Sequence, residues 1–240
     1  MSNSRDKLPT DAGSGAPSST VTEFLAKLAA VPAPRKAGVR GRLLFGLDAT
    51  ASRQPAWDRA CHIQAEMFAA AAELGGLDIQ LAYYRGFGEF HATPWLSDAA
   101  ALQRRMLGVS CLGGRTQIGK LLRHALVETK AKRVNAVVFV GDCMEEDSDA
   151  LCHRAGELGL LGAPLFIFHE RGERLAAETF RQMAKLSGGA YCRFDAGSAD
   201  ALRDLLRAVA VFATGGPAAL EDYSRRAGGP ALMLTHQLRR

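Results

Sequence analysis

The chain has 240 residues, of which 48% are hydrophobic and 23% charged, and this balance describes a folded globular protein rather than a disordered one. This length suits one sizeable core, so we expect one main domain with appendages. The formal net charge of +5 is mild, and no basic stretch alternates with aromatic residues, so a nucleic-acid partner is disfavoured.

The cysteines indicate a reducing environment. They are odd in number and scattered, at Cys61, Cys111, Cys143, Cys152 and Cys192, and no C-x-x-C occurs. Reduced thiols are therefore favoured over a disulfide framework or a zinc cage. The N-terminus lacks the charged-then-apolar layout of a signal peptide, and no apolar run approaches the length of a membrane span. We expect a cytoplasmic protein with no membrane partner.

Four segments follow one another along the chain. They are a disordered tail over 1–19, a short helix and linker over 20–41, the main domain over 42–212 and a C-terminal extension over 213–240. The tail is rich in Ser, Gly and Pro, and the capping-box spacing of Thr20 and Glu23 predicts the short helix. Two Gly-Gly-Pro sequences indicate that the extension consists of two loose helical pieces.

Short apolar runs alternate with stretches of helical spacing through the main domain. The predicted strands are 43–47, 77–84, 89–93, 134–140, 165–168 and 191–194. The predicted helices are 55–74, 98–107, 117–130, 148–158, 173–186 and 199–212. Continuous apolar strands between helices predict an α/β fold with a doubly wound, mostly parallel central sheet and helices on both faces. The short run 89–93 is predicted as an antiparallel edge strand beside 77–84.

One aspartate and two hydroxyls stand on alternate residues directly after the first predicted strand. Asp48, Thr50 and Ser52 form the pattern Asp-x-Thr-x-Ser, and this spacing on a turning loop lets their oxygens converge. Thr116 and Asp142, each near another apolar run, offer further oxygens. Function collects at the carboxyl ends of strands in such sheets, so we expect these residues to share a site. Oxygen donors of low total charge suit a hard divalent cation, Mg²⁺ (or Mn²⁺) before Zn²⁺.

The sequences around Asp48 and Thr116 resemble two loops of a known protein family. The von Willebrand factor A (VWA) domain family has a metal-ion-dependent adhesion site, MIDAS, built from three loops, and its first loop carries Asp-x-Ser-x-Ser. Residues 48–52 are similar to that loop, with Thr50 keeping the hydroxyl of a serine. The second loop usually has a glycine pair and then a threonine that opens a helix. Residues 113–117 resemble it, with Arg115 as one extra residue before Thr116.

The sequence around Asp142 resembles the third loop of that family. An aspartate usually closes an apolar strand there, commonly followed by glycine, and here Asp142 closes the run 137–141 with Cys143 in place of the glycine. The resemblance covers roughly residues 42–212 and implies the Rossmann-like fold already predicted. The thiol of Cys143 is either a redox sensor or a buried inert group, and the pattern favours the inert interpretation.

The resemblance also implies roles for the oxygens. Ser52 and Thr50 would bind the cation directly, Asp48 and Asp142 directly or through water, and Thr116 would join or leave as the loops shift. In the family the open coordination position commonly accepts a carboxylate from a partner protein. The resemblance therefore implies a metal-dependent protein-interaction module, within an intracellular assembly, rather than an enzyme.

Two alternatives concern acidic residues. The run Glu145–Asp147 after the third loop either supplies a carboxylate to the open metal position or forms the acidic start of a helix, and the helix start is favoured. The alternative function is a Mg²⁺-dependent, haloacid-dehalogenase-like phosphohydrolase with Asp48 as nucleophile. In that family the general acid is an aspartate two residues later, where this chain has Thr50, and a hydroxyl does not readily supply that proton.

Overall fold

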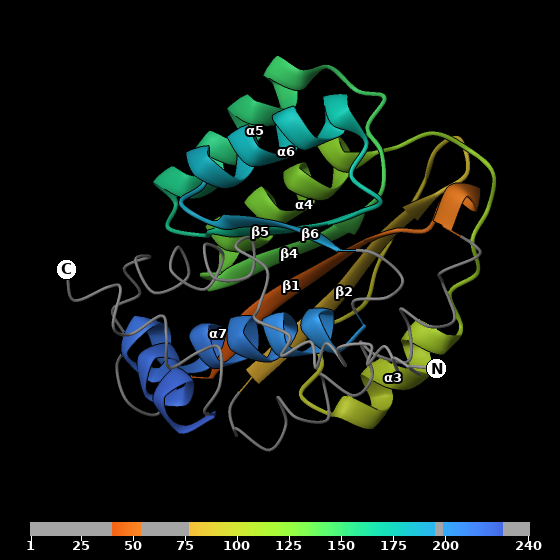
Figure 1. The fold of residues 1–240 in the computed structure, drawn as a ribbon. Helices are drawn as coiled ribbons and strands as arrows, with labels where there is room; N and C mark the ends of the chain where they lie inside the picture. The colour runs from red at the N-terminus through yellow and green to blue at the C-terminus, as the bar shows by residue number, and fades with distance from the viewer. Residues whose placement is uncertain (1–39, 54–76, 195–198, 228–240) are drawn as a thin grey trace, which may run out of the picture.

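A computed structural model of the protein describes residues 40–53, 77–194 and 199–227 (Figure 1). The predicted tail over 1–19, the short helix after Thr20 and the predicted helix over 55–74 lie outside the described residues, as does the end of the C-terminal extension. The rest of the predicted main domain can be compared with the sequence element by element.

Strands and helices alternate as the sequence predicts. The strands are β1 (Gly41–Asp48), β2 (Leu77–Arg85), β3 (Glu89–Ala92), β4 (Ala136–Gly141), β5 (Leu165–Glu170) and β6 (Ala190–Phe194). The helices are the 3-10 turn η1 (Ala51–Arg53), α3 (Ala99–Leu107), α4 (Ile118–Ala131), α5 (Ser148–Leu160), α6 (Arg174–Leu186) and α7 (Ala199–Ala227). Every predicted strand is present, and each predicted helix within the described ranges is present.

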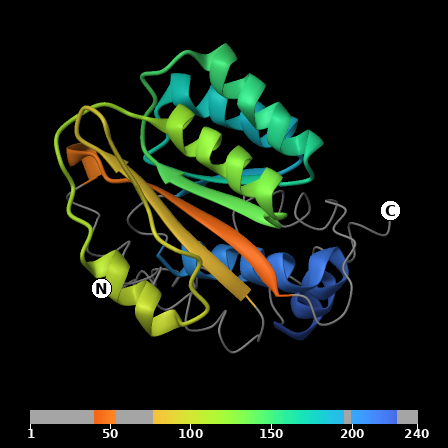
Figure 2. The same ribbon diagram turned by 180° about the vertical axis from the view of Figure 1, so that it is seen from behind.

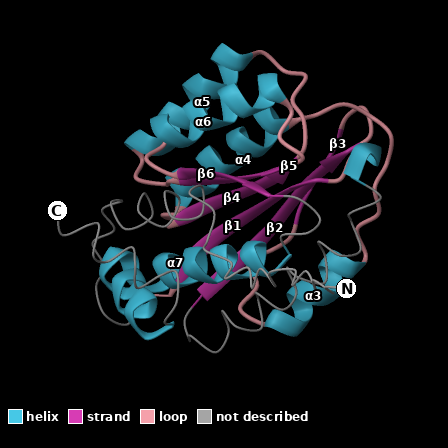
Figure 3. Ribbon diagram, in the orientation of Figure 1, coloured by secondary structure: helices cyan, strands magenta, loops and turns pink. Residues whose placement is uncertain are grey.

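The strands form one six-stranded sheet in the order β3-β2-β1-β4-β5-β6. All neighbours are parallel except β2 and β3, which pair antiparallel at one edge. Helices α4, α5 and α6 cover one face, and α3 and α7 cover the other, as the two opposite views show (Figures 1 and 2). Colouring by secondary structure makes the three layers plain (Figure 3). The predicted doubly wound α/β fold is confirmed.

Burial on both faces explains the continuous apolar strands. In β1, Leu43, Phe45 and Leu47 belong to the core cluster on the α3 and α7 side, and Leu44 belongs to the cluster on the α4 side. Gly46 lets α4 approach the sheet closely, because a Cβ there would lie 2.4 Å from Leu121 Cδ2. The central strand is thus fixed from both sides.

Helix α7 differs from its predicted end at residue 212. It continues to Ala227 across a kink at Gly216, where φ is +73°, a value that glycine adopts without strain. Leu220, beyond the kink, is buried in the same cluster as Phe212. The first part of the extension therefore packs on the domain instead of forming a loose piece, because Leu220 gains apolar contact there.

The sheet order creates a switch point between β1 and β4. From β1 the chain moves outward through β2 to β3, and then returns to place β4 on the other side of β1. In doubly wound sheets, binding sites collect beside the carboxyl ends of two such strands. Leu47 pairs with Val140 as the last pair of the β1–β4 ladder, so the residues that follow both strands begin side by side at this edge of the sheet. No helix in the described ranges is long and apolar enough to cross a bilayer.

Candidate metal centre

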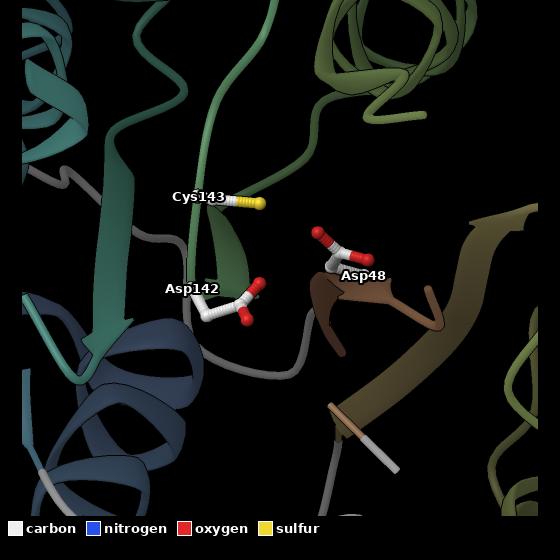
Figure 4. Close-up of side chains that lie close together, drawn as sticks. All are labelled: Asp48, Asp142 and Cys143. Atoms are coloured by element: carbon white, nitrogen blue, oxygen red, sulfur yellow. The ribbon is translucent and has the colours of Figure 1, made fainter. Parts of the chain in front are cut away.

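Two predicted ligands and one unexpected side chain meet at the switch point. Asp48 ends β1, and Asp142 and Cys143 follow β4 directly. One ligand atom from each of these three residues lies within 4.8 Å of the other two. Figure 4 shows both carboxylates and the sulfur pointing into the same space between the ends of the two strands. The predicted convergence of Asp48 and Asp142 is observed.

Asp48 is fully buried and firmly held. Its Oδ1 accepts the backbone N–H of Thr50 at 2.8 Å, and its Oδ2 accepts the hydroxyl of Tyr84 at 3.0 Å. Burial raises the pKa of Asp48, and the nearby Asp142 adds to this rise, whereas hydrogen bonds from Thr50 and the charge of Arg53 oppose it. The negative charge of this carboxylate is therefore costly unless a cation is present.

Asp142 carries an unsatisfied oxygen. Its side chain is only 6% exposed, and Oδ1 has no hydrogen-bond partner among the described residues. The backbone oxygen of the same residue lies 3.0 Å from His169 Nε2, so the loop itself is fixed while the carboxylate oxygen remains unpaired. A buried polar atom without a partner is unusual in a folded protein and requires an explanation. A bound cation between Asp142 and Asp48 would satisfy it.

The hydroxyls predicted as ligands lie on two of the loops. Thr50 Oγ1 and Ser52 Oγ are 3.1 Å apart on the first loop, with Thr50 buried and Ser52 exposed. Thr116 is bound to the third loop instead, because its hydroxyl accepts the N–H of Glu145 at 3.0 Å and its own N–H donates to Glu145 Oε2 at 3.1 Å. The structure thus brings Thr50, Ser52 and Asp48 together, and it links Thr116 to the loop that carries Asp142.

Backbone hydrogen bonds fix the second loop against the first. The N–H of Leu112 donates to the carbonyl of Ala49 at 3.0 Å, and the N–H of Arg115 donates to that of Gly86 at 3.2 Å. Gly114 is required at this crossing, since a Cβ there would lie 1.9 Å from the Gly86 carbonyl oxygen. The second glycine of the pair therefore serves a close backbone approach that brings the second loop against the turn after β2.

The carboxylates of the acidic run accept backbone N–H groups, and Asp147 forms the acidic helix start that the favoured interpretation predicted. Asp147 caps α5 by accepting the N–H of Ala150 at 2.7 Å. Glu146 instead caps α4, accepting the N–H groups of Ile118 at 2.6 Å and Gly119 at 2.8 Å. These carboxylates compensate the exposed N–H groups and positive dipole ends of two helices. The capping of α4 by the third loop was not predicted.

Arg53 connects the first loop to β5 through a buried ion pair and a hydrogen bond. The guanidinium is fully buried, with Nε 3.0 Å from Glu170 Oε2 on β5 and Nη1 donating to the backbone oxygen of Asp48 at 2.9 Å. Because Glu170 balances the charge of Arg53, the carboxylates of Asp48 and Asp142 set the net charge of the centre. Two negative charges match one divalent cation.

Comparison with known proteins gives the fold. No family model matches the sequence, and no curated protein sequence matches it. Solved structures do match: the SpRpn10 VWA domain aligns with a TM-score of 0.56 and 12% identity over 70% of this chain and 94% of that one. This protein has the fold of a VWA domain. The resemblance derived from the three loops is thereby confirmed at the level of the fold.

Other VWA-like matches are longer than this chain. The PilB minor pilin from Streptococcus sanguinis matches with a TM-score of 0.55 and 9% identity, over 74% of this chain and 62% of the pilin. Proximal thread matrix protein 1 from the mussel byssus, in a structure with a zinc-occupied MIDAS motif, matches with a TM-score of 0.57 and 14% identity, over 72% of this chain and 46% of that one. This VWA-like protein thus spans about half to two thirds of these longer relatives.

The donors of this VWA-like domain fit a divalent cation. Buried Asp48 and the unpaired Oδ1 of Asp142 supply charge, and Thr50 and Ser52 supply neutral oxygens on the loop that Asp48 begins. Cys143, interpreted from the sequence as buried and inert, is half-buried and joins the group. Burial, followed by the charges of Asp142 and Asp48, raises the pKa of the Cys143 thiol to about 12.

Sequence reasoning missed the residues that support the ligands. Tyr84 faces Asp48 across the β1–β2 ladder, and a tyrosine at the end of a strand next to the aspartate was a usable signal. The Arg53–Glu170 pair joins residues 117 positions apart, and nothing in the local pattern links them. For Cys143 the signal was its place directly after Asp142, where the family commonly has glycine.

Removing the carboxylate of Glu146 should uncap α4 within this VWA-like domain. We expect Glu146→Ala to lower the free energy of unfolding by about 1–2 kcal/mol, because two N–H groups at the helix start lose their acceptor. Chemical denaturation followed by circular dichroism measures this loss. Glu178→Ala, which removes an exposed carboxylate from α6, is the control. An equal loss in the two variants would contradict the capping role.

Proposed function

We propose that this protein is a divalent-metal-dependent protein-interaction module of an intracellular assembly. Five side chains would hold Mg²⁺ or Mn²⁺: Asp48, Thr50, Ser52, Thr116 and Asp142. The bound ion would supply an open position that accepts an acidic side chain from a partner protein. The observation that carries the proposal is the buried, unpaired Oδ1 of Asp142, whose side chain points toward Asp48 at the switch point of a VWA fold.

Charge supports the binding of an acidic partner. Only Asp48 and Asp142 contribute negative charge to the proposed ligand set, and the hydroxyls contribute none, so a divalent ion leaves the centre near neutrality. A near-neutral centre with an open position still attracts a carboxylate, whereas a cage of many carboxylates would not. Ser52, the exposed ligand, marks the side from which the partner side chain would approach.

Thr116 would adjust to the ion through the third loop. Its hydroxyl oxygen already accepts one hydrogen bond, from the N–H of Glu145, and retains a second lone pair. Because Thr116 and Glu145 are hydrogen-bonded in both directions, a shift of one loop would move the other. The binding of a partner at the ion would therefore shift the third loop, which caps α4.

The zinc-occupied MIDAS motif of the byssus protein supports a cation at this place in the fold. A cytoplasmic location is part of the proposal, and it is supported by the free thiols of Cys143, Cys152 and Cys192. Alkylation of freshly lysed cells should find these cysteines reduced.

The proposed function predicts a metal-dependent complex. With Mg²⁺ present, the full chain used as bait should retain a specific protein from a lysate of its own organism, and EDTA should release it. Asp48→Ala should fail to retain that protein, because the ion loses a ligand, while Asp149→Ala on the exposed start of α5 should retain it. Substituting the acidic residues of the retained protein should then identify one that is essential. A complex that survives both EDTA and Asp48→Ala would contradict the proposal.

The same preparations address the phosphohydrolase alternative. Both oxygens of Asp48 accept hydrogen bonds, and Thr50 stands where the general acid would be, so we expect no hydrolysis of an aryl phosphate with Mg²⁺. Turnover that is lost in Asp48→Asn would favour the enzyme and overturn the proposed function.

A further inference from the structure

Cys143 is placed as a metal ligand would be. Its sulfur and the carboxylate oxygens of Asp48 and Asp142 lie within 4.8 Å of one another, and all three side chains point into one space (Figure 4). Zinc bonds to sulfur and oxygen of about 2.3 and 2.1 Å allow two ligand atoms on one ion to be at most about 4.4 Å apart. The three ligand atoms, all within 4.8 Å of one another, would move closer together by side-chain rotation when they bind one ion.

A second observation points to a ligand in the same space. Asp142, with 6% of its surface exposed, has Oδ1 shielded from solvent and without a hydrogen-bond partner in the described part of the chain. The oxygen stays unpaired although the neighbouring backbone is well bonded, for example through His169. A cation in this space would therefore contact a carboxylate oxygen that the protein leaves unpaired, with the sulfur of Cys143 beside it.

We propose that Cys143 Sγ is itself a ligand of the cation, so that the centre binds thiophilic divalent ions such as Zn²⁺ or Co²⁺ in preference to Mg²⁺. This inference rests on the proposed metal site and specifies the chemistry of its ion. Sulfur ligands favour zinc and its neighbours in the first transition series, whereas Mg²⁺ prefers oxygen. On binding, the S–H bond breaks, its proton passes to solvent water, and a sulfur–metal bond forms, with no change of oxidation state.

The inference changes the expectation drawn from the oxygens alone. With Asp48, Thr50 and Ser52 as the only donors near Asp142, Mg²⁺ or Mn²⁺ is the expected ion. With Cys143 included, two classes of ion compete for one centre: hard ions that use the oxygens, and thiophilic ions that also use the sulfur. The Cys143→Ser variant separates the two classes, because it replaces only the sulfur and keeps a side chain of similar size.

Cobalt titration of the full chain under anaerobic conditions tests the proposal. Bound Co²⁺ should give a thiolate-to-cobalt charge-transfer absorption in the unmodified protein and in Cys111→Ser, which removes another half-buried thiol outside the group. The absorption should be absent in Cys143→Ser. The dissociation constant for Co²⁺ should rise at least about 10-fold in that variant. Added Zn²⁺ should displace the Co²⁺ at concentrations where Mg²⁺ does not.

Mn²⁺ binding, measured from the paramagnetic resonance of the free ion, distinguishes failure of this inference from failure of the proposed function. Mn²⁺ should bind the unmodified protein and Cys143→Ser with equal affinity. Mn²⁺ binding together with Co²⁺ binding that shows no thiolate absorption, or an absorption that persists in Cys143→Ser, would overturn the role of Cys143 alone. Binding of neither ion would overturn the metal site as well. Cys143→Ala, measured alongside, should behave as Cys143→Ser does.

Discussion

Mn²⁺ should raise the melting temperature of this protein, and replacing Asp142 with asparagine should abolish that rise. An ion that binds only the folded state stabilises it by mass action, by about 2.7 kcal/mol at 100 times its dissociation constant. For a chain of this size that corresponds to a rise in melting temperature of roughly 5–10 °C. Asparagine keeps the shape of Asp142 but removes its charge and one anionic oxygen, so the rise should disappear.

The metal-free protein should respond in the opposite direction. Without an ion, the charge of Asp142 adds to the rise in the pKa of Asp48, which means that the two carboxylates repel each other. Asp142→Asn removes this repulsion, so the metal-free variant should be at least as stable as the unmodified protein. A mutation that merely damaged the fold would lower both melting temperatures.

Thermal melts with and without Mn²⁺ measure both effects. Asp149→Asn, which neutralises an exposed aspartate at the start of α5, is the matched control and should keep the full rise with Mn²⁺. If Asp142→Asn kept the rise, the ion would bind elsewhere in the chain, and the proposed centre would be wrong.

Breaking the buried ion pair beneath the first loop should cost more stability than any other single change considered for this protein. Arg53→Ala leaves Glu170 buried and unpaired, and removing one partner of such a pair typically costs about 3–5 kcal/mol. The same variant removes the hydrogen bond that Arg53 donates to the backbone of Asp48. We therefore expect a loss of both stability and metal affinity.

A double variant separates these two losses. Arg53→Met combined with Glu170→Leu replaces the pair with apolar side chains, and such replacements of buried ion pairs are often neutral or stabilising. The free energy of unfolding, measured with urea, should recover most of the loss. Metal affinity should remain low, because this variant lacks the hydrogen bond that Arg53 donates to the Asp48 carbonyl. Full recovery of Mn²⁺ affinity would contradict the positioning role of Arg53.

The local sequence was sufficient to predict the fold and the proximity of Asp48 and Asp142. Apolar strands buried on both faces are recognisable from residues such as Leu43 to Leu47 and Val137 to Val140, because burial leaves no polar face. The prediction that Asp48 and Asp142 converge required only the strand order typical of a doubly wound sheet. The structure places these two carboxylates together. The ion and the full ligand set remain predictions.

What could not be predicted depends on contacts between distant residues. Glu146 caps α4 across 28 residues, and Arg53 reaches Glu170 across 117, and neither contact has a local signature. Helix α7 passes Gly215, Gly216 and Pro217, a sequence that normally ends a helix, because burial of Leu220 favours a second helical stretch after the kink. In each case tertiary packing outweighs the local preference.

The sulfur at residue 143 has a consequence for what the proposed interaction module would recognise. A thiophilic ion bound by two carboxylates and a thiolate carries one negative charge in excess, whereas an ion bound by the carboxylates and hydroxyls carries none. The first arrangement would repel an anionic side chain and the second would accept it. Abundant zinc would then prevent the binding of an anionic side chain, and scarce zinc would allow it, without any change in the fold.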